Sequence, residues 1–500
     1  MQRWLFHYPK FWQRLTGLLL SAAASLLLAT ACSHVQLSPT PTPDYAALEA
    51  QVAQKLQGTL AVKAPTATPT PKPTRTATAT LAPSSTPTAT PAPTALPTSA
   101  GPWLAWVRTS PEQPANIILY DIAQKREEPL TRFVEPQNMS DVAWSKNGQW
   151  LIFVSAHDFV HSRNNERNIF IVRPDGTDLQ MITGEYMNPD TAPGPYVTLR
   201  GQVTGAQTPC VVCAQGAVNP TTSDEKGSFE LAGVPLSAKW VRAVCQANGA
   251  TLQGDVALKT VGDNLDPATI AVEPKGQGWS QAAMARDGNT VAGISYQWTL
   301  DAEGKQQYTY KGLVLNAEGA HLGDIEIPAE TTLNGLEWLP TQNELIGALS
   351  GEKSTLLWRW DVQGKSIGAF VEIPNEDREI LSATSPMWSN DGSQLAFALR
   401  HWYWWDENKY KTEIVLVDVN GQNLRPLVQT DWGVDATHPS WSIDGALIYY
   451  QLSTGAPGDD FRSKSNGNIL AIAVAGDTPP IAVTDDDASY LPAARPGVTD

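Results

Sequence analysis

From residue 101 onward, the chain alternates short apolar runs with polar turns, and one pattern recurs. A Trp-Ser pair is followed by an Asp-Gly or Asn-Gly turn, an apolar run, a variable loop, and two further runs joined by a second turn. Clear copies begin at Trp144, Trp388 and Trp441, and degraded copies lie near Ser280 and Leu333. Apolar runs bounded by such turns are typical of antiparallel strands joined by hairpins. The pattern therefore predicts an all-β chain with four strands per copy, at a spacing of about 45 to 55 residues.

Repeats of four strands predict the blades of a β-propeller, in which twisted sheets pack face to face around an axis. The motif resembles the TolB-type propeller repeat, a relative of the WD repeat, over most of residues 101–500. We expect a six-bladed propeller, with blades one and two in residues 101–184 and blades three to six in residues 276–500. Residues 487–497 align without gaps to 435–445, which begin the last blade. The end of the chain is therefore expected to supply the first strand of blade one and to close the ring.

About 90 residues separate the second predicted blade from the third, more than the repeat requires. Residues 195–274 resemble the carboxypeptidase regulatory-like β-sandwich, most recognisably in the Asp-x-x-Gly-x-Phe-x-Leu run of residues 224–231. Gly227 is expected at a hairpin turn, with Phe229 and Leu231 on the buried face. The resemblance implies an inserted domain with a structural or binding role.

Three cysteines, Cys210, Cys213 and Cys245, fall within this predicted sandwich. The Cys-x-x-Cys spacing suits a redox pair at a helix N-terminus, but Val211 and Val212 favour a strand here. A zinc site needs a fourth ligand nearby, and the sequence offers none. A disulfide is the prediction for an exported protein. Because Cys210 and Cys213 would face opposite sides of a strand, only one of them can easily pair with Cys245, and one thiol is left over.

The first 100 residues differ from the rest. Residues 1–31 combine basic side chains with an uncharged apolar run, which is typical of a secretion signal. The run ends in Leu-Ala-Thr-Ala-Cys, which resembles a bacterial lipoprotein signal and implies that Cys32 is lipidated and holds the protein to a membrane. The alternative is an unlipidated signal peptide or a transmembrane anchor. Residues 32–100 are predicted to form a Thr/Pro-rich stalk with a short helix at 44–62, so we expect a cell-envelope protein that faces outside the cytoplasm.

The charge excludes one class of partner. The chain has 51 acidic and 35 basic residues, a net charge of −16, and no long run of Lys or Arg. Nucleic-acid binding requires a basic surface, so no nucleic-acid partner is expected. The expected partners are the membrane, through the N-terminal lipid, and an envelope protein, peptide or glycan.

Aromatic and histidine residues gather in loops expected to leave one face of the propeller. The five consecutive ring-bearing residues 401–405 cannot all be buried on a strand, because alternate side chains point opposite ways. They predict a surface that stacks on sugars or peptides, and the alternative is packing against the sandwich. The predicted ligand-binding residues are His401, Trp402, Tyr403, Trp404, Trp405, Trp298, His157 and His161.

One residue precedes the motif proline in each repeat, and together these residues are expected to form a ring around the mouth of the central channel. A polar ring there can hold water, a cation or the tip of a ligand, and the alternative is a merely solvated channel. The predicted channel-mouth residues are Asp141, Gln281, Ser385, His438 and Tyr490. The acidic run 485–487 is a weak candidate for calcium. Otherwise neither a cofactor nor a metal site is predicted.

Taken together, these features predict a non-catalytic binding or scaffold lipoprotein, with no residue assigned to catalysis. The alternative is a secreted propeller enzyme, a glycan lyase or hydrolase, that uses His157, His161, His401 and His438 with Asp residues. A passive envelope scaffold is a third hypothesis, favoured if the tryptophans prove to be covered by the sandwich.

Overall fold

The computed structural model describes most of the chain after residue 102. The described residues are 103–110, 113–134, 138–163, 165–247, 250–376, 379–403, 406–454, 467–476 and 478–497. The predicted signal, the lipidation site Cys32, the stalk and its helix at 44–62 lie outside them, as do Trp404 and Trp405. In the described stretches, no helix is both long enough and apolar enough to cross a membrane.

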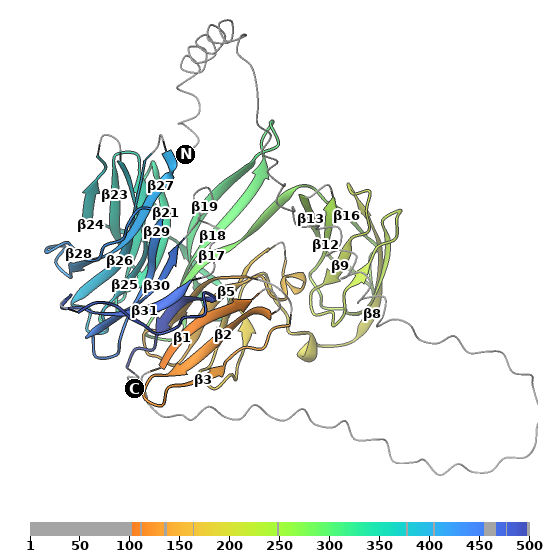
Figure 1. Ribbon diagram of the computed structural model, residues 1–500. Coiled ribbons are helices and arrows are strands. Elements are labelled where there is room, and N and C mark those ends of the chain that lie inside the picture. Colours follow the sequence, from red (N-terminus) through yellow and green to blue (C-terminus); the bar gives the residue numbers. More distant parts are fainter. Residues whose placement is uncertain are drawn as a thin grey trace, which may run out of the picture. The chain divides into compact units, whose positions relative to one another are not determined.

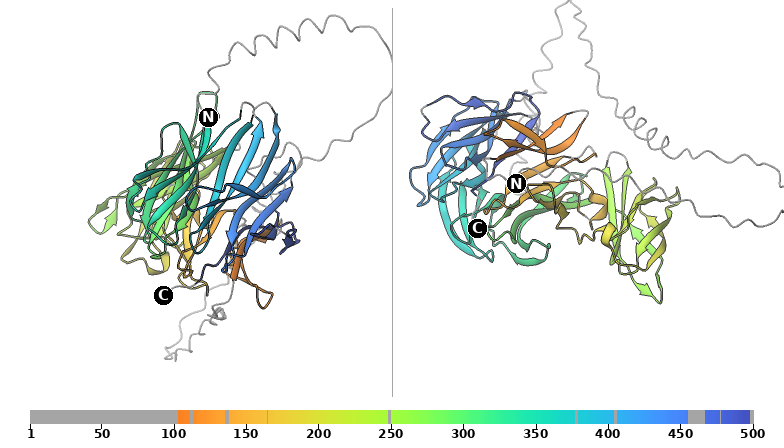
Figure 2. Two further views of the ribbon diagram at one scale, coloured as in Figure 1. Left: turned by 90° about the vertical axis from the view of Figure 1, so that its left-hand side faces the viewer. Right: turned by 90° about the horizontal axis from the view of Figure 1, so that it is seen from below.

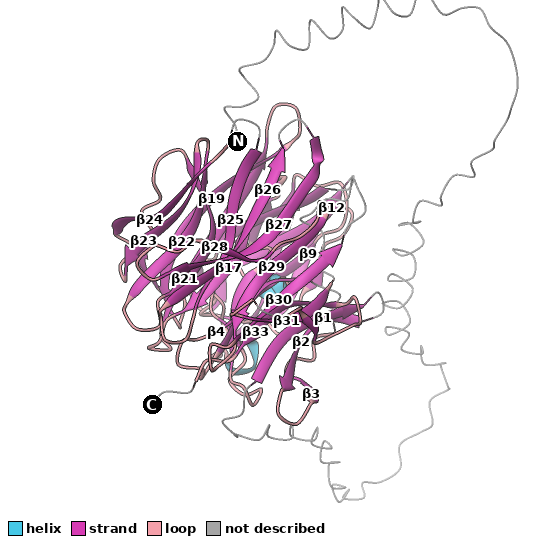
Figure 3. Ribbon diagram, turned by 60° about the vertical axis from the view of Figure 1, so that its left-hand side comes forward, coloured by secondary structure: helices cyan, strands magenta, loops and turns pink. Residues whose placement is uncertain are grey.

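Strands make up nearly all the regular structure of the described residues (Figure 3). The helical elements there are two single 3-10 turns, η1 (Phe159–His161) and η2 (Pro189–Thr191). The chain therefore has the predicted all-β class. Its successive four-stranded antiparallel sheets fit a β-propeller.

Two four-stranded sheets contain the first strands of the described chain, in the orders β3-β2-β1-β33 and β4-β5-β6-β7. The first sheet consists of β1 (Trp103–Ser110), β2 (Gln113–Asp121), β3 (Arg126–Pro129) and β33 (Ser489–Ala494). The second consists of β4 (Met139–Trp144), β5 (Leu151–Ser155), β6 (Asn168–Val172) and β7 (Gln180–Met181). The last described strand thus pairs antiparallel with the first.

The strands after residue 274 repeat this four-strand pattern (Figure 1). They are β17 (Lys275–Met284), β18 (Thr290–Leu300), β19 (Gln306–Asn316), β20 (His321–Asp324), β21 (Thr331–Trp338), β22 (Glu344–Gly351), β23 (Ser354–Asp361) and β24 (Ser366–Pro374). They continue with β25 (Glu379–Trp388), β26 (Gln394–Tyr403), β27 (Asp406–Asp418), β28 (Arg425–Val428), β29 (Val434–Trp441), β30 (Leu447–Thr454), β31 (Asn468–Ala473) and β32 (Ile481–Ala482). The last two groups of four join through one parallel pair, Thr412 with Asp435. The right-hand view of Figure 2 shows the sheets following one another in chain order.

The turn after each motif tryptophan is set by its own side chains. Ser389 Oγ donates to Asp391 Oδ1 at 2.7 Å, and the same oxygen accepts the backbone N–H of Ser393 at 3.0 Å. Gly392 follows with a φ of 71°, a left-handed conformation that favours glycine. Because this turn places the next strand against the first, the Ser-x-Asp-Gly sequence predicts the hairpin.

The motif tryptophans connect one group of four strands to its neighbour. Each of three indole N–H groups donates to a backbone carbonyl of another group: Trp144 to Ala493 at 2.9 Å, Trp338 to Ala283 at 3.1 Å and Trp441 to Met387 at 2.9 Å. All three rings are buried. A buried indole usually needs a partner for its N–H, so these bonds explain why the repeat keeps tryptophan between its sheets.

These bonds also correct the alignment of the final strand. Trp441 donates to Met387, the residue before Trp388, whereas Trp144 donates to Ala493. Ala494 therefore takes the place of the motif tryptophan in β33. His438 lies three residues before Trp441, so its equivalent in β33 is Leu491, three residues before Ala494. Both residues have a left-handed φ, 52° for His438 and 55° for Leu491. The ungapped alignment that put Tyr490 in this position is wrong by one residue.

Strands β8 to β16 form two larger sheets that share one apolar core, and β14 and β15 pair as a separate two-stranded sheet. The sheet β10-β9-β12-β13 lies on one side of the core, and the sheet β11-β8-β16 on the other. The strands are β8 (Tyr196–Thr204), β9 (Val211–Ala214), β10 (Thr221–Thr222), β11 (Ser228–Pro235), β12 (Trp240–Ala247), β13 (Ala250–Ala257), β14 (Thr260–Val261), β15 (Asn264–Leu265) and β16 (Ala268–Ala271). Phe229 and Leu231 are buried while Glu230 between them is exposed, which is the period of a half-buried strand. We refer to strands β8 to β16 as the two-sheet unit.

Candidate functional site

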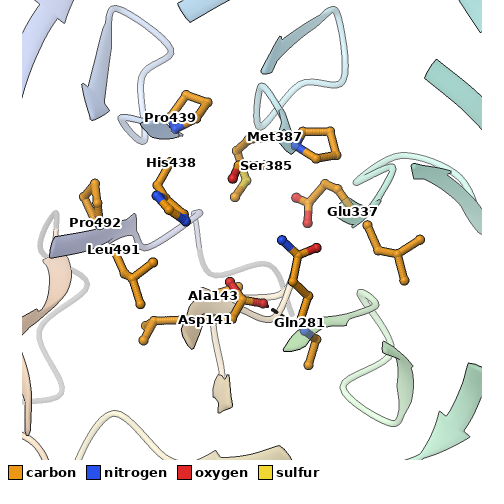
Figure 4. Close-up of a pocket in the computed structure, with 14 residues that line it drawn as sticks. Asp141, Ala143, Gln281, Glu337, Ser385, Met387, His438, Pro439, Leu491 and Pro492 are labelled. Atoms are coloured by element: carbon orange, nitrogen blue, oxygen red, sulfur yellow. Dashed lines mark hydrogen bonds between the residues drawn. The ribbon is translucent and has the colours of Figure 1, made fainter. Parts of the chain in front are cut away.

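A small cavity lies where six strands from the repeated sheets converge (Figure 4). Strands β4, β17, β21, β25, β29 and β33 each contribute to its lining, and we call it the six-strand cavity. Its polar lining residues are Asp141, Gln281, Glu337, Ser385 and His438. The cavity measures about 40 Å³, room for a few water molecules and far below the size of a pocket for a sugar.

Polar atoms in the six-strand cavity are strongly perturbed by burial. Burial raises the pKa of Asp141 to about 7, although its carboxylate accepts the backbone N–H of Ala282 at 2.8 Å. Burial lowers the pKa of His438 to about 4, so its imidazole is neutral at pH 7. Gln281 Oε1 and His438 Nδ1 have no hydrogen-bond partner among the described residues. Figure 4 shows the side chains of Asp141, Gln281, Glu337 and His438 directed toward the same space.

Four of the five predicted channel-mouth residues line this cavity, namely Asp141, Gln281, Ser385 and His438. Leu491 occupies the fifth position, and Tyr490 instead lies in a neighbouring apolar core, because of the one-residue shift in β33. Sequence reasoning missed Glu337, which is 2% exposed and forms an ion pair with Lys146 from another sheet. A pair between residues 191 positions apart leaves no local signal in the sequence.

A second group of polar and aromatic side chains lies on the long hairpin β26–β27. His401 is flanked by two carboxylates, with Nδ1 2.8 Å from Glu379 and Nε2 3.5 Å from Glu413. Lys411 Nζ lies 2.5 Å from Glu413 and 5.7 Å from the centre of the Trp432 ring. This arrangement places both charge signs beside an aromatic ring.

The aromatic part of this group is partly open to solvent. The rings of Tyr403 and Trp432 are tilted against each other, with centroids 5.2 Å apart. Trp432 is 41% exposed, and Trp402 and Tyr403 are half-buried. We call His401, Trp402, Tyr403, Lys411 and Trp432, together with Glu379 and Glu413, the hairpin surface. Trp432 was missed because it lies outside the ring-bearing run, in the loop before β29.

Two predicted ligand-binding residues are buried, which corrects their expected role. Trp298 is 5% exposed, and its N–H donates to Glu166 at 3.1 Å. His157 is buried and stacks on Phe133, with ring centroids 3.9 Å apart. Both rings are buried because residues distant in the sequence, Glu166 and Phe133, pack on them. The local sequence does not reveal such contacts. Tyr308, by contrast, is well exposed on the other long hairpin, β18–β19.

The predicted histidines do not gather in one place. His157 bonds to Ser155, His161 to Asp158, and His401 to Glu379, while His438 lines the six-strand cavity. Within the described residues, no group of three His, Cys, Asp or Glu side chains has the geometry of a metal site.

Two of the three carboxylates in the acidic run 485–487, which was considered for calcium, already have partners. Asp486 accepts from Arg108 at 2.8 Å and from Ser489 at 2.9 Å, and Asp487 accepts from Asn468 at 2.6 Å.

The two-sheet unit is held by the segment around η1. Arg242 of β12 is 1% exposed, and its guanidinium donates to the carbonyls of Ser162 and Asn165, both at 3.0 Å. Arg163 pairs with Asp255 of β13 at 2.6 Å. Burial lowers the pKa of Arg242 to about 10, an effect that nearby carboxylates oppose. These polar contacts form a specific joint between the unit and the loop after β5.

Cys210 and Cys245 form a disulfide, and Cys213 lies outside it and is buried. Cys210 directly precedes β9, and Cys213 lies opposite Arg242 in the β9–β12 pairing. The thiol left over is thus Cys213, on the opposite face of the strand from Cys210. The Cys213 side chain lies next to the His161 imidazole and helps to raise the pKa of that imidazole.

His161 gives the joint a measurable pH dependence. Burial opposes its protonation, but Asp158 and Cys213 raise the pKa of His161 to about 10. A folded-state pKa above the unfolded value of 6.5 stabilises the fold fully below pH 6.5, and this stabilisation is lost as pH rises through about 10. Between pH 7 and pH 9.5, the free energy of unfolding should fall by about 3 kcal/mol more in the wild type than in His161→Gln. Urea unfolding at both pH values measures this difference, and parallel pH profiles for the two proteins would contradict it.

Comparisons with known proteins extend only to fold. No protein-family model matches the chain, and no curated protein matches it. Among solved structures, it is similar to TolB from Acinetobacter baumannii, at 12% identity and a TM-score of 0.38, over 79% of this chain and 67% of that chain. It is also similar to a chain of a nidogen/laminin complex (9% identity, TM-score 0.40, 79% and 98% covered) and to a 6-phosphogluconolactonase-like protein from Bacteroides uniformis (11%, 0.37, 79% and 99%). The function is therefore inferred from the side chains of this chain alone.

Proposed function

We propose that the repeated sheets form a six-bladed propeller that the pairing of β33 with β1 closes. Two observations support it. One strand from each of six groups lines the six-strand cavity, and the last described strand completes the sheet of the first. The two-sheet unit would then be a β-sandwich of the carboxypeptidase regulatory-like type, inserted between the second and third blades at residues 195–274.

We propose that the protein is a lipoprotein of the cell envelope. Cys32 would attach it to the membrane, and the Thr/Pro-rich stalk would carry the folded part of the chain. The sequence of residues 1–100 supports this assignment. The disulfide between Cys210 and Cys245 agrees with an oxidising compartment outside the cytoplasm.

Its proposed activity is to bind a glycan or peptide of the envelope at the hairpin surface. The observation that carries this proposal is the half-open pair of Tyr403 and Trp432, bordered by Lys411 and Glu413. Aromatic rings supply apolar contact area to the face of a sugar ring or to a peptide side chain. Neighbouring charged groups supply the directional hydrogen bonds that select a ligand.

The hairpin surface suits binding better than acid–base chemistry. Both nitrogens of His401 face carboxylates, Glu379 and Glu413, and Lys411 pairs with Glu413 as well. A general base needs a ring nitrogen that can reach the substrate proton. Here the histidine is held as part of a charged network, which fixes the orientation of the strand that carries Trp402 and Tyr403.

The triple variant Trp402→Ala/Tyr403→Ala/Trp432→Ala tests this proposal. We expect at least a tenfold loss of binding on glycan arrays or in pull-downs of envelope peptides and proteins, because the aromatic contact area is removed. The matched control is Tyr308→Ala/Tyr310→Ala, which removes exposed rings from the other long hairpin and should leave binding unchanged.

Each other outcome is informative. Wild-type binding profiles in the triple variant would overturn the proposal. Release of new reducing ends or unsaturated products from an arrayed glycan would favour the enzyme hypothesis instead. Loss of binding in the Tyr308 and Tyr310 control alone would move the ligand site to β18–β19.

A further inference from the structure

The six-strand cavity contains an unusual set of acceptor atoms that the proposed binding function does not use. Asp141 presents a carboxylate, Gln281 an amide oxygen and His438 a ring nitrogen, each from a different strand. Gln281 Oε1 and His438 Nδ1 are shielded from solvent and have no hydrogen-bond partner among the described residues. Burying a polar atom without a partner costs roughly 1–3 kcal/mol, so such atoms call for an explanation.

The charges around the cavity indicate the sign of what it would hold. Among the described residues Asp141 forms no ion pair, whereas Glu337 is paired with Lys146. The remaining lining side chains are uncharged at neutral pH or apolar. An ionised Asp141 would therefore repel an anion, whereas a cation would compensate its charge.

The size of the cavity limits the cation to a small one. About 40 Å³ admits a single ion with one or two waters, but not an organic ligand. A nitrogen donor beside oxygen donors suits a first-row transition metal better than calcium or magnesium, which prefer all-oxygen sites. Two of the three donors are a histidine and a carboxylate, and the third is an amide oxygen.

We propose that Asp141, Gln281 and His438 form a binding site for one divalent transition-metal ion in the six-strand cavity. The ion would tie together strands β4, β17 and β29, which come from three different sheets. It would therefore brace the inner strands of the fold, and its binding is independent of the hairpin surface.

The backbone at His438 dictates the choice of variant. His438 has a φ of 52°, and asparagine tolerates this left-handed conformation better than alanine does. His438→Asn therefore removes the imidazole with least strain. Asp141→Asn keeps the size of the side chain and removes its charge, and Gln281→Met replaces the amide by an apolar chain of similar length.

The experiment titrates the purified protein, after treatment with a chelator, with Co²⁺ and Mn²⁺. We expect one equivalent of Co²⁺ to bind with a visible absorption band that reports nitrogen ligation, and to raise the melting temperature. His438→Asn and Asp141→Asn should each weaken binding at least tenfold. His321→Asn, which removes an exposed histidine paired with Asp324, is the matched control and should bind as the wild type does.

Several results would overturn the metal site. They are the absence of stoichiometric binding, unchanged affinity in His438→Asn and Asp141→Asn, or an equal loss in His321→Asn. If either cavity variant fails to fold, Gln281→Met provides the same comparison. The triple variant of the hairpin surface should keep full metal affinity, so failure of the ligand-binding proposal and failure of the metal site are distinguishable.

Discussion

Truncation of the chain after Asp487 is expected to destabilise the fold severely and to favour aggregation. The truncation removes β33, and with it the buried side chains of Tyr490, Leu491 and Ala493. It also removes the carbonyl that accepts the indole N–H of Trp144. Burial of one large apolar side chain stabilises a fold by about 1.5–3 kcal/mol, so losing this strand costs a large part of a typical total of 5–15 kcal/mol.

The truncation also exposes a sheet edge. Strand β1 would present an unpaired row of backbone groups, which invites pairing between chains. Size-exclusion chromatography and thermal melting are the measurements, and we expect aggregates or a melting temperature lowered by more than about 10 °C. Removal of residues 498–500 alone is the control and should leave both unchanged. A monomeric truncated protein that melts within a few degrees of the wild type would show that the β1–β33 pairing is not essential.

Replacing Arg242 by alanine is expected to cost about 3–5 kcal/mol of stability. The guanidinium is buried at the joint, and its loss leaves the carbonyls of Ser162 and Asn165 without their donor. It also removes a positive charge near Glu166 and Asp255, of which Asp255 keeps its ion pair with Arg163. Removing one partner from a buried charged network costs more than the network itself contributes. Urea unfolding and limited proteolysis of the joint are the measurements.

The control for this prediction lies in the same two-sheet unit. Arg200 is exposed and pairs with Glu230 at 3.1 Å, and Arg200→Ala should leave the free energy of unfolding close to that of the wild type. Arg242→Lys keeps the charge but loses the fork of donors, so we expect an intermediate cost. A cost for Arg242→Ala as small as that for Arg200→Ala would mean that the joint is not held by this side chain.

Much of the fold was predictable because its signals are local. The Ser-x-Asp-Gly turns are set by side chains within four residues, as Ser389 and Asp391 show. Phe229 and Leu231 alternate with exposed residues, so the strand period identifies the buried face. The all-β class followed from these patterns alone.

The functional side chains were harder to predict because exposure depends on distant segments. Trp298 lies in an aromatic-rich hairpin but is covered by Glu166, and His157 is covered by Phe133. Trp432 reaches Tyr403 from another loop, which no spacing rule indicates. The strand register also mattered, since a one-residue shift replaced Tyr490 by Leu491 at the six-strand cavity.

Oxidative footprinting of aromatic side chains tests the proposed binding surface most directly. The protein is labelled with hydroxyl radicals alone and with a saturating amount of the glycan or peptide that it retains in the binding assays. Binding at the hairpin surface predicts that Tyr403 and Trp432 become protected while the exposed Tyr308 keeps its reactivity. Unchanged labelling of Tyr403 and Trp432 in the presence of bound ligand would contradict it.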